Sequence, residues 1–198
     1  MSYLMTTTLN RIWACNPCDE GRWRALRAAG KNAPDDEQIT YQQIVEAVGL
    51  DDALWCCQAE PQYDREWRLF AVWCARQVQH LMSDQRSIDA LDVAERYAHG
   101  EATDEQLDAA RAAARDAAWD AWDAAEPAPW AAAWAVTRAT ARAPWATARD
   151  TARAPLDAAA AQALLGETVA ATGDAQRDAF IQLVTTGELP EIVRQEVQ

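Results

Sequence analysis

The sequence has little of what most enzymes use for catalysis. It contains two histidines, seven glycines and a single lysine, Lys31. It has no His-Glu-x-x-His motif, no glycine-rich phosphate loop and no nucleophile elbow. Carboxylates are numerous, but in an acidic chain they usually form a solvated face. We therefore expect a protein that is not an enzyme and that uses no cofactor.

Long apolar runs are also missing. No stretch of eighteen apolar residues occurs, and the first residues lack the basic and apolar regions of a secretory signal. The five cysteines, an odd number, argue against the disulfide framework of a secreted protein. We therefore expect a soluble, cytoplasmic protein.

The cysteines offer one pair with zinc-binding spacing, Cys15 and Cys18. A closed zinc site normally needs a second pair of similar spacing, which the adjacent Cys56 and Cys57 do not provide. Cys74 falls on the apolar face of a predicted helix, where a free cysteine behaves as a small hydrophobic residue. We expect core packing rather than metal binding.

Alanine and tryptophan are abundant. Alanine dominates, and β-branched residues are few except near the ends, which favours helix. We predict an all-α fold, a multi-helix bundle or array, in which alanine faces pack closely and the ten tryptophans fill the gaps. Residues 1–100 should form a helical head. Residues 101–198 should form an Ala/Trp/Arg-rich helical region packed against it, as a second part or within one continuous domain.

Apolar periodicity and stop residues place most helices. The first is predicted from about Thr7, and another over 41–48, ending at Gly49. The clearest amphipathic helix starts at Asp64. The last segments are predicted as two helices, over 156–172 and 174–186.

A long helix is predicted after Thr103, which can cap it together with Gln106. It should run to about Ala125, because prolines at 127 and 129 cannot continue a helix. The next helix is predicted over about 129–143. Prolines 144 and 155 either kink a long helix or begin new ones.

Residues 138–159 nearly repeat after eleven positions, and the same interval separates Trp119 from Trp130 and Trp134 from Trp145. Three helical turns take about 10.8 residues, so this interval keeps side chains on nearly one face. Solenoid repeats are usually about 20–45 residues long. Packed helices are therefore favoured over a solenoid.

The net charge is −13, which opposes direct binding to nucleic-acid phosphates and favours a basic protein partner. Acids concentrate in 101–126, where four of them share one i, i+4 line. The alternative interpretation is a solvated face that keeps an alanine-rich helix soluble. The candidate partner-binding residues are Asp104, Glu105, Asp108, Asp116, Asp120, Asp123 and Glu126.

Four arginines, at 138, 142, 149 and 153, form a locally positive row after this helix. We expect them to pair with the acids of 104–126 across an antiparallel contact, which would fix the register of the two segments. RNA binding is the less favoured interpretation, because the net negative field opposes anions.

Three stretches carry a resemblance to a known family: "GLDDALWCCQA" (49–59), "DREWRLFAVWCAR" (64–76) and "SIDALDVAERYAHGEATDEQLDAARAAARDAAW" (87–119). Together they resemble the Ala/Trp-rich helical family of bacterial and phage proteins described as immunity proteins. The resemblance covers about residues 49–135 and implies a protein that neutralises a toxin or a competing system by binding it. It implies no catalytic residues. The four prolines between 127 and 155 depart from the family's uninterrupted Ala-Trp tract.

Acidity and the lack of catalytic motifs lead to one preferred function. We expect an acidic inhibitor that blocks a basic, nucleic-acid-binding protein surface, for instance a phage counter-defence protein such as an anti-CRISPR. A toxin-neutralising immunity protein is the alternative within the same class. A structural or assembly protein of a phage is the alternative from another class. None of these interpretations specifies an oligomeric state.

Overall fold

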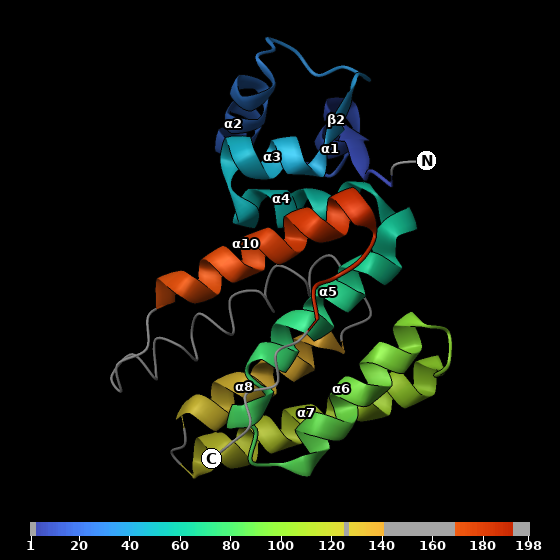
Figure 1. Cartoon of the computed structure of the whole chain (residues 1–198), viewed down its shortest axis with the longest axis vertical. Helices are drawn as coiled ribbons and strands as arrows, with labels where there is room; N and C mark the ends of the chain where they lie inside the picture. The colour runs from blue at the N-terminus through green and yellow to red at the C-terminus, as the bar shows by residue number, and fades with distance from the viewer. Residues whose placement is uncertain (1–2, 125–126, 141–168, 192–198) are drawn as a thin grey trace.

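The computed structural model describes residues 3–124, 127–140 and 169–191, and within them the fold is all-α, as predicted (Figure 1). The only sheet in these ranges has two antiparallel strands. In chain order the elements are β1 (Thr6–Thr8), α1 (Leu9–Ala14), α2 (Asp19–Ala29), β2 (Gln38–Thr40), α3 (Tyr41–Val48), α4 (Leu50–Cys56), the 3-10 turns η1 (Cys57–Ala59) and η2 (Pro61–Tyr63), α5 (Asp64–Gln77), η3 (Gln79–Leu81), α6 (Gln85–Ala98), α7 (Asp104–Asp123), α8 (Pro127–Ala139) and α10 (Val169–Thr186).

The first element corrects the sequence prediction of a helix from Thr7. Residues 6–8 form β1, in which Thr7 pairs with Ile39 of β2. Thr8 stays extended, with φ of −132°, because it is the N-cap of α1 and accepts a hydrogen bond from the Arg11 backbone. β-Branched threonines suit this extended backbone, and the helix begins only after them.

Several predicted helices are confirmed. α3 covers 41–48, and its capping box joins Thr40 and Gln43. Gly49 follows with φ of +88°, a conformation that costs glycine little and lets α4 begin at once. α5 begins at Asp64, and α7 begins after the predicted capping box of Thr103 and Gln106.

Three helix boundaries differ from the prediction. α8 begins at Pro127, two residues early, because proline is well suited to a first helical turn. It ends at Ala139, before the predicted end at about 143. α10 runs unbroken through Gly173, where the sequence predicted a separation. An interior glycine costs only about 1 kcal/mol, and the buried Phe180 and Leu183 anchor this helix in the core. The predictions for prolines 144 and 155, and for a helix starting at 156, fall outside the described residues.

Aromatic side chains join distant parts of the chain in the core. Trp67 of α5 is fully buried between Tyr41 of α3 and Phe180 of α10, with ring centroids 5.1 and 5.9 Å away. Phe70, one turn along α5, lies 5.3 Å from Phe180. Figure 1 shows α10 returning beside α3 and α4, far from the other helices that follow α5. These contacts are part of one hydrophobic cluster that includes residues from both halves of the chain.

Helices α5 to α8 pack at the other end of the molecule (Figure 1). The core face of α7 consists of Leu107 and alanines, and α8 contributes further buried alanines, which confirms packing through alanine faces. Small side chains let helix axes approach closely. The buried Arg68 of α5 lies over the Tyr97 ring of α6 and donates to the Ala139 carbonyl at 3.4 Å. None of the helices in the described ranges is long and apolar enough to cross a membrane.

Candidate functional site

The acidic helix predicted from the sequence is α7, and its burial pattern explains which residues it exposes. Leu107, Ala110, Ala114, Ala117 and Ala121 are buried at three- and four-residue spacing. This face packs against α6 and α8. The charged side chains are therefore turned to solvent along the whole helix.

The acids at the start of α7 are engaged within the protein. Asp104 accepts a hydrogen bond of 2.8 Å from the Tyr97 hydroxyl, and Glu105 and Asp108 also have interaction partners. Asp104 and Glu105 lie in the first helical turn, where the helix dipole favours negative charge. Asp104 and Glu105 therefore have a structural role at the start of α7.

The acids at the end of α7 have a different setting. Asp120 forms an ion pair with Arg86 of α6, whereas Asp116 and Asp123 make no ion pair or hydrogen bond with any described residue. Hydrogen bonds from Arg86 to Asp84 and Asp120 raise the pKa of this guanidinium. No basic residue occupies the last turn of α7. Negative charge is unfavourable at a helix C-terminus, although the nearby N-terminus of α8 offsets part of the effect.

Two tryptophans lie among these acids. Trp119 is 51% exposed and Trp122 is 57% exposed, despite contacts with Trp134 and Trp130 of α8. The ring centroids are 6.1 Å apart in the first pair and 5.3 Å apart in the second. We refer to Asp116, Trp119, Asp120, Trp122 and Asp123 as the Trp–Asp patch.

Sequence reasoning included the three acids of this patch but missed its tryptophans, which were expected to fill gaps in the core. Leu107 carried the necessary signal, because it is the only large aliphatic residue in α7. Alternating steps of three and four residues from Leu107, through 110, 114, 117 and 121, reach buried alanines, and they leave Trp119 and Trp122 off that face. The remaining predicted residue, Glu126, lies outside the described residues.

The predicted pairing of the arginine row with α7 is largely outside the described residues. Arg138 is half-buried in α8 and has an interaction partner, but 142, 149 and 153 are not described. The cation that reaches the Trp–Asp patch in the described structure is Arg86, from α6. No pattern in the sequence joins residues 86 and 120, because they lie on separate helices.

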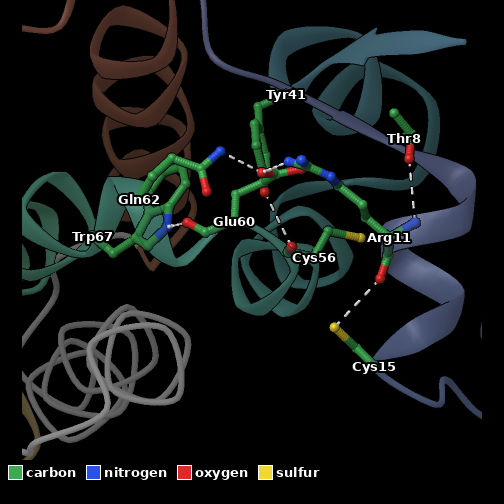
Figure 2. A network of polar contacts seen from close by, with 8 residues as sticks. All are labelled: Thr8, Arg11, Cys15, Tyr41, Cys56, Glu60, Gln62 and Trp67. Carbon is green, nitrogen blue, oxygen red and sulfur yellow. Dashed lines mark hydrogen bonds and ion pairs between the residues drawn. The ribbon is translucent and has the colours of Figure 1, made fainter. Parts of the chain in front are cut away.

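A second polar cluster surrounds Glu60 in the head (Figure 2). The Glu60 side chain is fully buried, and its Oε2 atom accepts hydrogen bonds from Arg11 Nη1 and Gln62 Nε2. Its backbone oxygen accepts a bond of 3.3 Å from Trp67 Nε1. Close by, the Tyr41 hydroxyl donates to the Cys56 carbonyl at 3.1 Å. The cluster connects α1, α3, α4, η2 and α5.

Burial controls the chemistry of the groups near Glu60 and of the other buried thiols. It raises the pKa of the Tyr41 hydroxyl, raises the pKa of the Cys56 thiol to about 12, and raises the pKa of Cys57 and of Cys74. The pKa of Cys15 is raised mainly by burial and to a smaller extent by the negative charge of Glu60. These groups stay protonated at neutral pH, and a protonated thiol is a poor nucleophile. The arrangement therefore suits structural support rather than covalent chemistry.

The cysteines do not come together with other ligands. Cys15 ends α1 and Cys18 caps α2, on either side of the predicted turn. Cys56, Cys57 and Cys74 are buried free thiols. Across residues 3–124, 127–140 and 169–191, no three His, Cys, Asp or Glu side chains are grouped so that they could hold a metal ion.

No family model, curated protein or solved structure matches this chain significantly. Function is therefore inferred from the geometry of the Trp–Asp patch.

Proposed function

We propose that this protein binds a basic surface of another protein through the Trp–Asp patch, and that it thereby blocks nucleic acid from that surface. The observation that carries the proposal is the pair of half-exposed tryptophans, Trp119 and Trp122, set among three carboxylates. The two rings sit on α7, which is fixed by its packing between α6 and α8.

Exposed tryptophans of this kind favour protein binding. Tryptophan is enriched among the few residues that dominate protein interfaces, because a rigid ring buries a large area at little entropic cost. A tryptophan face also attracts arginine and lysine side chains through cation–π interaction, typically by about 0.5–2 kcal/mol. The rings and the carboxylates therefore select the same kind of partner, one rich in cationic side chains.

Electrostatics supports the same partner class. Asp116 and Asp123 lack a cation among the described residues, and Asp123 lies at the negative end of α7. A basic partner would supply the missing positive charge. Carboxylates spaced about one helical turn apart are sparser than the phosphates of DNA, so they would occupy part of a phosphate-binding surface rather than copy a whole strand.

Two biological settings fit this activity. A phage counter-defence protein, such as an anti-CRISPR, would cover the DNA-binding channel of a bacterial complex. An immunity protein would cover the basic substrate-binding surface of a nuclease toxin, in keeping with the family resemblance of residues 49–135. Both settings use the same patch against the same partner chemistry.

The test is a pull-down from a bacterial lysate with the intact protein and two variants. One variant reverses the patch charges (Asp116→Lys, Asp120→Lys, Asp123→Lys). The matched control reverses three exposed acids elsewhere (Asp36→Lys, Glu46→Lys, Glu101→Lys), so that both variants change the net charge equally. The captured protein should be basic, and added nucleic acid should compete for it. Its capture should also weaken as salt rises, because exposed charges are screened.

We expect the wild type and the control to capture the same partner, and the patch variant to lose it while its helical circular dichroism is unchanged. A partner captured equally by all three proteins would overturn the electrostatic part of the proposal. A further variant, Trp119→Ala with Trp122→Ala, should also reduce capture. Undiminished capture by that variant would show that the tryptophans do not contribute.

A further inference from the structure

A second hollow surface lies in the head, away from the Trp–Asp patch. A cavity of about 390 Å³ opens between α1, α2, α3 and α4. Its walls are mainly aliphatic and aromatic, and they include Leu9, Ile12, Ile39, Ile44 and Trp55. This volume is in the range of small-molecule pockets, which are typically about 300–1,000 Å³ and mostly apolar.

A neighbouring hollow of about 470 Å³ continues toward α10. The two hollows share four lining residues, Arg24, Val48, Asp51 and Asp52, so they meet at one place. The second hollow is also lined by Gln176 of α10. Gln176 can line this hollow because α10 passes beside α3 and α4 (Figure 1).

Arg24 and Asp52 at the meeting point are already paired with each other, and Asp51 beside them also has an interaction partner. Arg24 Nη1 lies 2.9 Å from Asp52 Oδ2, and Arg24 Nη2 donates to the Val48 carbonyl at 3.2 Å. A charged ligand would have to break this pair or leave its own charge uncompensated in an apolar cavity. The site therefore favours an uncharged ligand.

Gln176 supplies a polar group that lacks a partner. Its side chain is 1% exposed, and its Nε2 atom has no hydrogen-bond partner among the described residues. A buried unpaired donor costs about 1–3 kcal/mol. A ligand atom that accepts a hydrogen bond from Nε2 would remove this cost.

We propose that the joined hollows bind a small, uncharged, largely apolar molecule with a carbonyl oxygen at one end. The apolar part occupies the cavity between α1 and α4. The carbonyl oxygen reaches the second hollow and accepts a hydrogen bond from Gln176. This site is independent of the Trp–Asp patch and of the function proposed for it.

The test compares two probes with the same carbon skeleton, 4-phenylbutan-2-one and butylbenzene, which differ in one carbonyl oxygen near the end of the chain. Dissociation constants are measured by NMR titration of the full-length wild type and of Gln176→Leu, which keeps the size of the side chain and removes the donor. The wild type should bind both probes. The ratio of ketone to hydrocarbon affinity should fall about tenfold in Gln176→Leu, the equivalent of one hydrogen bond of about 1.4 kcal/mol.

An unchanged ratio in Gln176→Leu would overturn the role of Gln176, and no binding of either probe by the wild type would overturn the site itself. Ala47→Trp, at the wall of the first cavity, should weaken both probes equally by filling the space. Glu46→Trp is the matched control, because it adds the same ring next to Ala47 at an exposed position that does not line the cavity. Equal effects of these two substitutions would contradict the proposed location.

Discussion

At the residue scale, Glu60 shows how a buried carboxylate is kept in an apolar head. It is fully buried, and its Oε2 atom is bound by Arg11 and Gln62 (Figure 2). Its other oxygen, Oε1, has no partner among the described residues. Loss of Arg11 would leave a buried charge with one neutral donor, which is far more costly than loss of an exposed ion pair.

The substitution Arg11→Ala should therefore lower the free energy of unfolding by about 1–3 kcal/mol, a value that allows for the 58% exposure of the Arg11 side chain. Urea denaturation measures the change. Arg27→Ala is the control, because Arg27 is an exposed residue of α2, and it should stay within about 0.5 kcal/mol of the wild type. If the two variants lose equal stability, the Arg11–Glu60 contact is not supporting the head.

The buried thiols predict a specific alkaline sensitivity. Burial raises the pKa of Cys56 to about 12 and raises that of Cys57 and Cys74, whereas an unfolded cysteine has a pKa of about 8.5. A group with a raised folded-state pKa gives its full stabilisation below the unfolded pKa, and this stabilisation is lost as the pH rises toward the folded value. Stability should therefore fall between pH 9 and pH 11.

In this range each buried thiol should lower the free energy of unfolding by about 1.4 kcal/mol per pH unit. Urea denaturation at several pH values, in the presence of a reductant, measures the total slope. In the variant Cys74→Ala, the free energy of unfolding should fall less steeply with pH, by about the contribution of one thiol. This difference does not depend on the variant's stability at pH 7. A slope that does not change on removal of Cys74 would show that this thiol does not titrate with unfolding.

At the scale of single elements, α7 combines a tightly packed alanine face with an exposed charged face. Ala114 is fully buried, whereas Ala112, two positions earlier, is exposed to solvent. The two residues have the same side chain and the same helix propensity. Their different surroundings make them a matched pair for testing the packing of α6, α7 and α8.

Ala114→Leu should destabilise the protein by about 1–3 kcal/mol, because the added atoms force neighbouring helices apart. Ala112→Leu should change stability by less than about 0.5 kcal/mol, since leucine is also a good helix former at an exposed site. Chemical denaturation compares the two variants. Equal stabilities would contradict the assignment of the alanine face to the interior.

Sequence patterns predicted the elements that have strong local signals. α3 is bounded by a capping box and by Gly49, and α7 begins at a second capping box, so both starts are readable from the sequence. β1 has three residues and no periodicity, and it forms only because β2 lies beside it. α10 continues through Gly173 because tertiary packing outweighs a local helix breaker.

The candidate site was predictable only where it has a local sequence signal. The i, i+4 spacing of the acids identified the exposed side of α7, and it included Asp116, Asp120 and Asp123. It did not separate these from Asp104, which a tyrosine of α6 holds. The exposure of Trp119 and Trp122 depends on how much of each ring α8 covers, which is a tertiary property.

At the scale of the whole molecule, the two proposed surfaces lie in different regions. The Trp–Asp patch lies on α7, and the hollow lies among α1 to α4 and the start of α10, at the other end of the view in Figure 1. Substitutions at well-separated sites usually have additive effects. Variants of one surface should therefore leave binding at the other unchanged, which keeps the two proposals separately testable.

The central claim is that the Trp–Asp patch excludes nucleic acid from a basic partner. Its most direct test is a mobility-shift assay with the purified partner, labelled nucleic acid and increasing amounts of this protein. We predict that the wild type and the Asp36→Lys, Glu46→Lys, Glu101→Lys control release the nucleic acid, while the Asp116→Lys, Asp120→Lys, Asp123→Lys variant leaves it bound. A stable complex that contains nucleic acid, partner and wild-type protein together would contradict the account.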